Sequence, residues 1–178
     1  MAYTMSIDGY TQIKEAYSLD EKRSYLTLID FTLPSNEKRL WLIDVSSNEL
    51  LYHTYVAHGR NTGDAVAEQF SNIPKSYQSS LGFYITGNTY HGRNGYSMYL
   101  DGLEEGINDK ARERAIVMHG AWYANEVMIK KFGRLGRSFG CPSVPEYIHK
   151  ELIDTISDKT ILFIYHSNQE YQDTSRFF

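Results

Sequence analysis

The sequence predicts a mainly-β domain, either a sandwich or a partly closed barrel, with a few short helices. Three observations predict it. From residue 25 onward the apolar residues mostly recur every second position, which is the period of a strand. Clusters of Pro, Asn, Ser and Gly separate these runs into short segments. Helical periodicity is confined to a few short stretches, and a length of 178 residues suits one domain.

Seven segments carry the strand pattern. They are Tyr25–Phe31, Arg39–Val45, Leu50–Ala57, Gly82–Thr86, Ser97–Leu103, Ala115–His119 and Ile161–His166. The first three are joined by tight turns at Pro34–Asn36 and Ser46–Asn48, which indicates an antiparallel meander. The polar segment Gly59–Ser80 has no period and is expected to be a long surface loop of functional importance.

Helices are expected in three places within the domain. Asn108–Arg114 would begin at an Asn108 N-cap, Tyr123–Lys131 follows, and Pro145–Ile156 would begin with a capping box of Ser143 and Glu146. The first residues fit a short amphipathic helix less clearly. We therefore divide the chain into an N-terminal helix or arm at 1–24 and the domain proper at 25–178.

Composition excludes several classes of function. Eighteen basic and twenty-two acidic residues give a formal charge of -4, which does not favour nucleic acid or an anionic membrane as a partner. No apolar run approaches the roughly 20 residues of a spanning helix, and no signal peptide is apparent. The one cysteine excludes an internal disulfide and any multi-cysteine zinc or iron–sulfur site.

That cysteine, Cys141, lies in a setting typical of a reactive thiol. Gly140 and Pro142 keep its loop irregular, and Gly140 would let backbone amides converge beside the sulfur as an oxyanion hole. A predicted helix begins two residues later, and its dipole would favour the thiolate. Four upstream cations act in the same direction. They are Lys130, Lys131, Arg134 and Arg137.

A thiol nucleophile needs a base, and His119 is the best candidate of the six histidines. It ends an apolar strand and precedes Gly120, so that its ring would emerge at a strand terminus. His58 and His91 each precede a glycine in a loop and could border a cleft. His53 and His149 fit surface or core positions, and the alternating faces of a strand separate His53 from His58, which makes a metal site unpromising. No cofactor is expected.

The order of these motifs resembles the murein L,D-transpeptidase catalytic-domain branch of the YkuD-like superfamily. The signature of that superfamily is a His followed further along by Ser/Thr-His-Gly-Cys. Here His119-Gly120 is followed by Ser138-Phe-Gly-Cys141, inside Gly133-Arg-Leu-Gly-Arg-Ser-Phe-Gly-Cys-Pro142. Further similar strings are Val56-Ala-His-Gly-Arg60, Phe70-Ser-Asn72, Ser79–Tyr84, Gly92-x-x-Gly95 and Asp101-Gly-Leu-Glu104. The likeness covers residues 25 to 166.

The resemblance implies a cleft in a β-rich domain and a reaction on peptidoglycan stem peptides, which serve as donor and acceptor. It makes Cys141 the nucleophile that forms a thioester and His119 the base, with the Gly120 carbonyl orienting the imidazole. Backbone amides of Gly140 and Cys141, together with Phe139, would form the oxyanion hole. Phe139 departs from the family pattern because it replaces the usual His, and Pro142-Ser143 departs from the usual pair after the cysteine.

Substrate-binding residues are less sharply indicated. Arg137 and Arg134 could bind stem-peptide carboxylates, and Arg60 and Arg93 are weaker candidates for the same role. Further candidates for the cleft are Ser138, which could instead brace the catalytic loop, and Tyr90, together with the loop histidines His58 and His91.

Alternatives to transpeptidation stay open at this point. Transfer of the thioester to water would make an L,D-carboxypeptidase, and loss of catalysis would leave a peptidoglycan-binding module. The resemblance places the protein in the bacterial cell envelope, in the periplasm or exported. Sequence leaves the oligomeric state undetermined.

Overall fold

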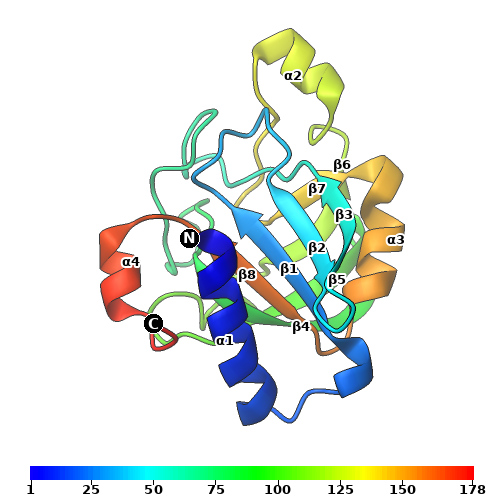
Figure 1. Cartoon of the computed structure of the whole chain (residues 1–178). Helices are drawn as coiled ribbons and strands as arrows, with labels where there is room; N and C mark the ends of the chain where they lie inside the picture. Colours follow the sequence, from blue (N-terminus) through cyan, green and yellow to red (C-terminus); the bar gives the residue numbers. More distant parts are fainter.

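All eight strands join one sheet in a computed structural model that describes residues 1–178, in the order β3-β2-β1-β8-β4-β5-β6-β7 (Figure 1). The strands are β1 (Tyr25–Asp30), β2 (Leu40–Asp44), β3 (Glu49–Thr54), β4 (Gly82–Gly92), β5 (Gly95–Gly102), β6 (Val117–Ala121), β7 (Ser143–Pro145) and β8 (Ile161–Tyr165). The first three strands pair antiparallel, which confirms the predicted meander.

The last strand lies in the middle of the sheet. β8 pairs parallel with β1 and antiparallel with β4, and all five of its residues are buried. An uninterrupted apolar sequence suits such a strand, because both of its faces are covered by the core. The strand therefore links the β1–β3 meander to β4–β7, where the candidate catalytic residues lie.

The sheet curls until its two edges approach each other. The chain leaving β3 forms a bridge at Ala57 with Ser143 of β7, and the Ala57 amide donates a hydrogen bond of 2.8 Å to the Ser143 carbonyl. Because β3 and β7 are the two ends of the strand order, this bridge nearly closes the sheet. The prediction of a mainly-β domain with a few short helices is confirmed, and of its two forms, sandwich or partly closed barrel, the structure is the barrel-like one.

Four α-helices and one short 3-10 helix surround the sheet. They are α1 (Ala2–Ala16), η1 (Glu21–Arg23), α2 (Glu126–Phe132), α3 (Glu146–Ile156) and α4 (Gln169–Thr174). Figure 1 shows α1 lying along β1 and β8, which it contacts, while α2 projects from one end of the molecule. Tyr10 and Ile13 of α1 are buried in the main core, so residues 1–24 contribute packing to the rest of the chain. The division at residue 24 stays a prediction.

Two local predictions are wrong. Residues 108–114 form turns instead of a helix, because the Asn108 side chain is held by the carbonyls of Leu81 and Phe83 and by the amide of Glu104. Ser143 does not cap α3 either. It belongs to β7, and the N-cap of α3 is Pro145, which makes no side-chain capping bond.

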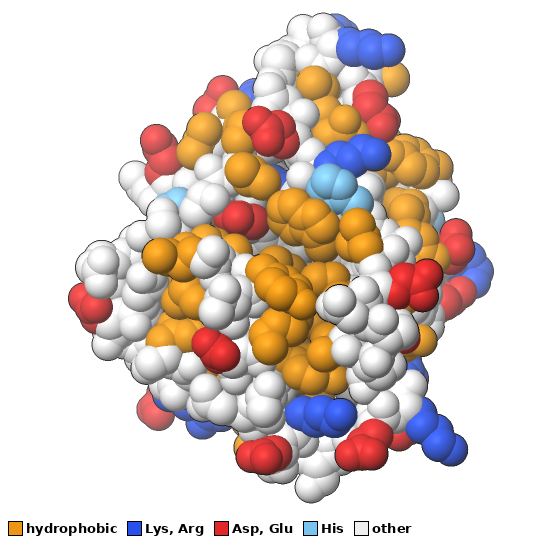
Figure 2. All heavy atoms as spheres, in the orientation of Figure 1, with side chains coloured by type: hydrophobic (Ala, Val, Ile, Leu, Met, Phe, Trp, Pro, Cys, Tyr) orange, Lys and Arg blue, Asp and Glu red, His pale blue; other side chains and the backbone are white.

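The surface formed by the start of α1 together with β1 and β2 carries apolar side chains. Figure 2 shows hydrophobic groups gathered in the middle of this face with charged groups around them. A shallow hollow there is lined mostly by apolar residues, among them Met1, Tyr3, Leu28, Trp41 and Ile43. No helix of the chain has both the length and the apolar character needed to cross a bilayer.

Candidate active site

Pairing between β4, β5, β6 and β7 aligns four polar residues in one row. Tyr90 pairs with Ser97, Ser97 with His119, and His119 with Ser143. Directly paired residues direct their side chains to the same face of a sheet. The row therefore gathers a phenol, two hydroxyls and an imidazole at the end of the sheet where the Cys141 loop enters β7.

The imidazole of His119 is held by a directed chain of hydrogen bonds. Its Nδ1 lies 2.9 Å from the Gly120 carbonyl oxygen, and its Nε2 lies 3.0 Å from Ser143 Oγ. A carbonyl can only accept, so Nδ1 carries the proton and Nε2 presents its lone pair to the Ser143 hydroxyl. Tyr123 then donates to Ser143 Oγ over 3.2 Å. The chain runs from Tyr123 through Ser143 to His119 and ends on Gly120.

Burial favours the neutral form of this imidazole. His119 is only 5% exposed, and desolvation lowers its pKa below the ordinary histidine value. The hydrogen bond to Gly120 and the charge of His149 act on the pKa more weakly, in opposite directions. His119 is thus a neutral base at pH 7, with a basic nitrogen held in a fixed direction.

The thiol of Cys141 is buried, and its hydrogen bond goes to the Ala115 carbonyl, 3.6 Å from Sγ. Desolvation raises the pKa of this thiol, against opposing effects from the Val117 and Cys141 amides and from the charge of Arg114. The expectation of a thiolate favoured by a helix dipole is therefore wrong, because β7 separates Cys141 from α3.

Arg114 is the cation that acts on the thiol, a role the sequence had assigned to the upstream lysines and arginines. Its guanidinium donates to the carbonyls of Ser71 and Gln78 at 2.6 and 2.7 Å, and to two serine hydroxyls, and it forms no ion pair. These hydrogen bonds connect the long loop 59–80 to the segment that precedes β6. No local signal in the sequence separates Arg114 from other arginines, since its partners lie about forty positions away.

Ser138 braces the loop that carries the thiol. Its Oγ accepts from the Gly140 amide at 3.0 Å and donates to the Cys141 carbonyl at 2.7 Å. The Gly140 amide is therefore already occupied, whereas the amides of Phe139 and Cys141 donate no backbone hydrogen bond within the protein. Gly140 itself adopts φ +124 and lies close to the Gln78 carbonyl, where a side chain would clash.

The two arginines expected to bind substrate bind the protein itself. Arg134 Nε lies 2.7 Å from an Asp64 carboxylate oxygen, and Arg137 Nη1 lies 3.5 Å from the same oxygen. Arg137 also donates to the carbonyls of Gly63 and Arg60. Their positive charge is therefore partly neutralised by Asp64, and their donors organise the loop around residues 60–64.

His58 is likewise turned inward. It is 1% exposed, its Nδ1 accepts from Arg39 Nη2 at 2.8 Å, and its Nε2 donates to the Asp64 carbonyl at 3.1 Å. Burial, with the adjacent guanidinium, lowers the pKa of His58 to about 4. Both ring nitrogens are occupied, so His58 holds the loop together and offers no free atom to a substrate.

The remaining two candidates for the cleft, Tyr90 and His91, lie side by side on β4. Tyr90 stacks on Tyr99 with ring centroids 4.4 Å apart, and desolvation, with the neighbouring Tyr99, raises the pKa of its phenol. His91 is exposed at the end of β4 beside Tyr96, and as the next residue along the strand it faces the opposite side. The structure therefore places Tyr90 on the face of the sheet that carries His119 and Ser143, and His91 on the opposite face.

No part of the chain gathers three or more His, Cys, Asp or Glu side chains in a metal-binding arrangement. His53 bonds the Lys38 carbonyl and stacks on Trp41, while His58 is held by Arg39 in the interior. The candidate site is accordingly a thiol, an imidazole and the hydrogen bonds that orient them.

Residues 1–165 match the L,D-transpeptidase catalytic domain family, YkuD_2. The chain belongs to this family. The resemblance seen in the sequence is thereby confirmed. A search of curated proteins finds no match.

The solved structures that match the chain include a helical cell shape determining protein and several L,D-transpeptidases. The Campylobacter jejuni cell shape determining protein Pgp2 superposes with a TM-score of 0.50 at 13% identity, covering 82% of this chain and 48% of that one. An L,D-transpeptidase from Mycobacterium smegmatis gives 0.49 at 10% identity, covering 80% and 59%. One from Stackebrandtia nassauensis gives 0.48 at 12% identity, covering 93% and 68%. The chain thus spans about half to two thirds of the length of these structures.

Proposed function

We propose that the protein is a cysteine L,D-transpeptidase that forms a Cys141 thioester with peptidoglycan stem peptides. The observation that carries the proposal is the fixed polarity of the hydrogen-bond chain, which keeps His119 Nε2 unprotonated at the strand end next to the thiol loop, with the Ser143 hydroxyl on its lone pair. Gly120 takes the place that a carboxylate has in a serine-protease triad. Family membership supplies the substrate class.

Acylation begins when the Ser143 hydroxyl releases His119 Nε2 and the thiol turns from the Ala115 carbonyl to this nitrogen. His119 Nε2 takes the proton, and Sγ attacks the carbonyl carbon of the third stem residue. The developing oxyanion receives hydrogen bonds from the free amides of Phe139 and Cys141. When the tetrahedral intermediate collapses, the bond to the terminal D-residue breaks, and the departing amine takes its proton from the imidazolium.

Deacylation repeats the proton transfers with an incoming amine. The amine of a second stem peptide gives its proton to His119 and attacks the thioester carbonyl, and the sulfur leaves as a thiolate that is then reprotonated. Tyr90, which is aligned with His119 through Ser97, would form one wall of the donor site. The reaction requires no cofactor, and we expect it to take place in the bacterial cell envelope, where the polymer lies.

Mass spectrometry of purified tetrapeptide muropeptides tests the proposal. Wild type should remove one D-alanine and form a 3–3 dimer, and trapping with acid should leave an acyl group on Cys141. Cys141→Ala should do neither, and Cys141→Ser should retain the fold with little turnover because the hydroxyl is a poorer nucleophile.

Each outcome of this experiment decides between named functions. Free tripeptide stems without dimers would show an L,D-carboxypeptidase. Binding of muropeptides without any product from wild type would show a peptidoglycan-binding module. Full turnover by Cys141→Ala would overturn the assignment of the nucleophile.

A further inference from the structure

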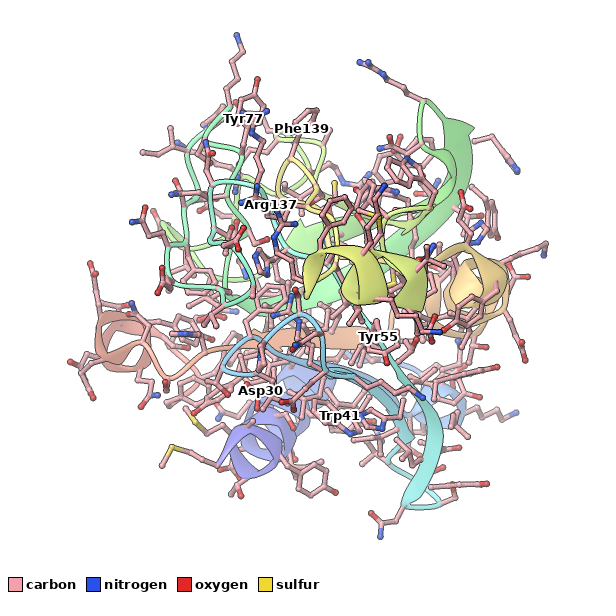
Figure 3. The ribbon with its side chains drawn as sticks, turned by 90° about the horizontal axis from the view of Figure 1, so that it is seen from above. Asp30, Trp41, Tyr55, Tyr77, Arg137 and Phe139 are labelled. Carbon is pink, nitrogen blue, oxygen red and sulfur yellow. The ribbon has the colours of Figure 1, made fainter.

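A guanidinium lies over two aromatic rings at the rim of the thiol loop. The Arg60 guanidinium carbon is 5.5 Å from the centroid of Tyr77 and 5.9 Å from that of Phe139, and the two rings are 4.8 Å apart. Figure 3 shows Tyr77 and Phe139 together at the edge of the molecule. Phe139 is two positions from Cys141 and is 64% exposed, and the bridge between Gly59 and Ser138 joins the Arg60 segment to the same loop, so this cluster lies on the loop that carries the thiol.

The backbone fixes the three side chains relative to one another. The Arg60 amide donates to the Ser138 carbonyl at 2.8 Å, and the Asn61 amide donates to the Tyr77 carbonyl at 3.1 Å. Tyr77 adopts a left-handed φ of 56, which is unfavourable for an aromatic residue. Strain of this kind persists only where the surrounding structure holds it. Here the strained backbone places the Tyr77 ring against the Arg60 guanidinium.

The charge of Arg60 has no partner inside the protein. Its side chain donates no hydrogen bond and forms no ion pair, in contrast to Arg134 and Arg137 on Asp64 and to Arg114 on backbone carbonyls. Stacking on two rings restricts the orientation of the guanidinium but occupies none of its N–H donors, because a cation–π contact involves the flat face and leaves the N–H edge free. An oriented and uncompensated fork of donors fits a carboxylate.

We propose that Arg60 binds the C-terminal carboxylate of the donor stem peptide, with Tyr77 and Phe139 holding its guanidinium. The proposal rests on the proposed function for the identity of the peptide. It gives Arg60 the role that the sequence had assigned first to Arg137 and Arg134. It also gives a purpose to Phe139, the aromatic residue that replaces the usual histidine of the family motif.

Alkylation of Cys141 tests the carboxylate site without requiring turnover. Iodoacetate carries a carboxylate and iodoacetamide does not, and the ratio of their rates cancels any change in the thiolate fraction. Arg60→Gln should lower this ratio about fivefold, the effect of about 1 kcal/mol for a partly exposed ion pair. Arg176→Gln is the matched control, since Arg176 also lies over a ring, that of Phe177, and it should leave the ratio unchanged.

Steady-state kinetics then tests the natural ligand. Arg60→Gln should raise KM for a free-acid tetrapeptide about tenfold with little change in kcat, and Arg60→Lys should recover part of the loss. A tetrapeptide with a C-terminal amide should have the same KM with wild type and Arg60→Gln. Equal KM values for the free acid would overturn the proposal, as would an unchanged alkylation ratio. If wild type turns over neither peptide, the proposed function fails, and the alkylation ratio still decides whether Arg60 recruits a carboxylate.

Discussion

Burial holds the Cys141 thiol and the His119 imidazole neutral at pH 7. It raises the pKa of the Cys141 thiol and lowers the pKa of the His119 imidazole, since each charged form loses solvation in the interior. A resting thiolate–imidazolium pair would require the opposite shifts. In the proposed mechanism the charge separation therefore arises only during the reaction, when the oxyanion amides become engaged.

The pH dependence of alkylation checks this protonation state. The rate of iodoacetamide reaction with wild-type Cys141 should rise with pH and reach its midpoint above the ordinary cysteine pKa, because only the thiolate reacts and burial raises its pKa. Stopped-flow or mass-spectrometric alkylation from pH 5 to 11 measures it. A midpoint at or below neutrality would show a resting ion pair instead.

Ser143 should act as a positioning residue for His119. Ser143→Ala removes the hydroxyl that meets Nε2 at 3.0 Å and interrupts the chain from Tyr123. We expect kcat to fall about fivefold with KM unchanged, which corresponds to about 1 kcal/mol for one hydrogen bond. Tyr123→Phe breaks only the outer bond and should have a smaller effect on kcat. An unchanged kcat in Ser143→Ala would mean that Gly120 alone orients the ring.

Sequence reasoning could propose Cys141 and His119 as a pair because both lie in short local motifs, and their catalytic roles stay a prediction. It did not find Ser143, Tyr123 or Arg114 as members of the site, since their roles depend on β6–β7 pairing and on loop contacts that no spacing reveals. Four of its predicted ligand residues proved to have internal partners. They are Arg134, Arg137, His58 and Ser138.

At the scale of elements, strands were predicted better than helices. The two-residue period survives wherever one face of a strand is buried, so all seven predicted segments overlap observed strands. β7 was missed because three residues carry no period, and it was mistaken for a helix cap. The turns at 108–114 have helical composition, but the tertiary bonds of Asn108 outweigh that local preference.

Packing between α1 and the sheet depends on Gly9. A Cβ at this position would lie 2.1 Å from Phe83 Cζ, and Phe83 is fully buried and stacked on Phe163 with centroids 4.0 Å apart. Gly9→Ala should therefore lower the free energy of unfolding by about 1–3 kcal/mol through overpacking, although Gly→Ala normally stabilises a helix by about 1 kcal/mol. Urea denaturation measures the difference.

Thr11→Ala provides the matched control for that substitution. Thr11 is exposed on the same helix and bonds only the Ile7 carbonyl, so Ala should leave stability unchanged or raise it by about 0.5 kcal/mol. If Gly9→Ala proved as stable as Thr11→Ala, α1 would not be seated on Phe83 as described.

At the scale of the whole molecule, the buried guanidinium of Arg39 connects the loop 55–67 to the sheet through hydrogen bonds. Arg39 is fully buried, and desolvation lowers its pKa to about 9. Its guanidinium donates to the carbonyls of Val56 and Leu33 and to His58, and it lies 4.7 Å from the Phe31 ring centroid. His58 must stay neutral for this arrangement, because protonation would place two cations in contact.

The fold should therefore lose stability in mild acid. The pKa of His58 is about 4 in the folded protein and about 6.5 when unfolded, so between these values the unfolded chain binds a proton that the native state does not. The free energy of unfolding should fall as pH drops from 6.5 to 4, by on the order of 3 kcal/mol from His58 alone. The lowered pKa values of His119 and His166 act in the same direction, and the raised pKa of the Glu104 carboxyl partly offsets them. Urea unfolding at closely spaced pH values measures the slope, and NMR titration of the imidazole protons should show one ring that stays neutral below pH 5. Stability that is constant or rises over this range would contradict the buried neutral pairing of His58 with Arg39.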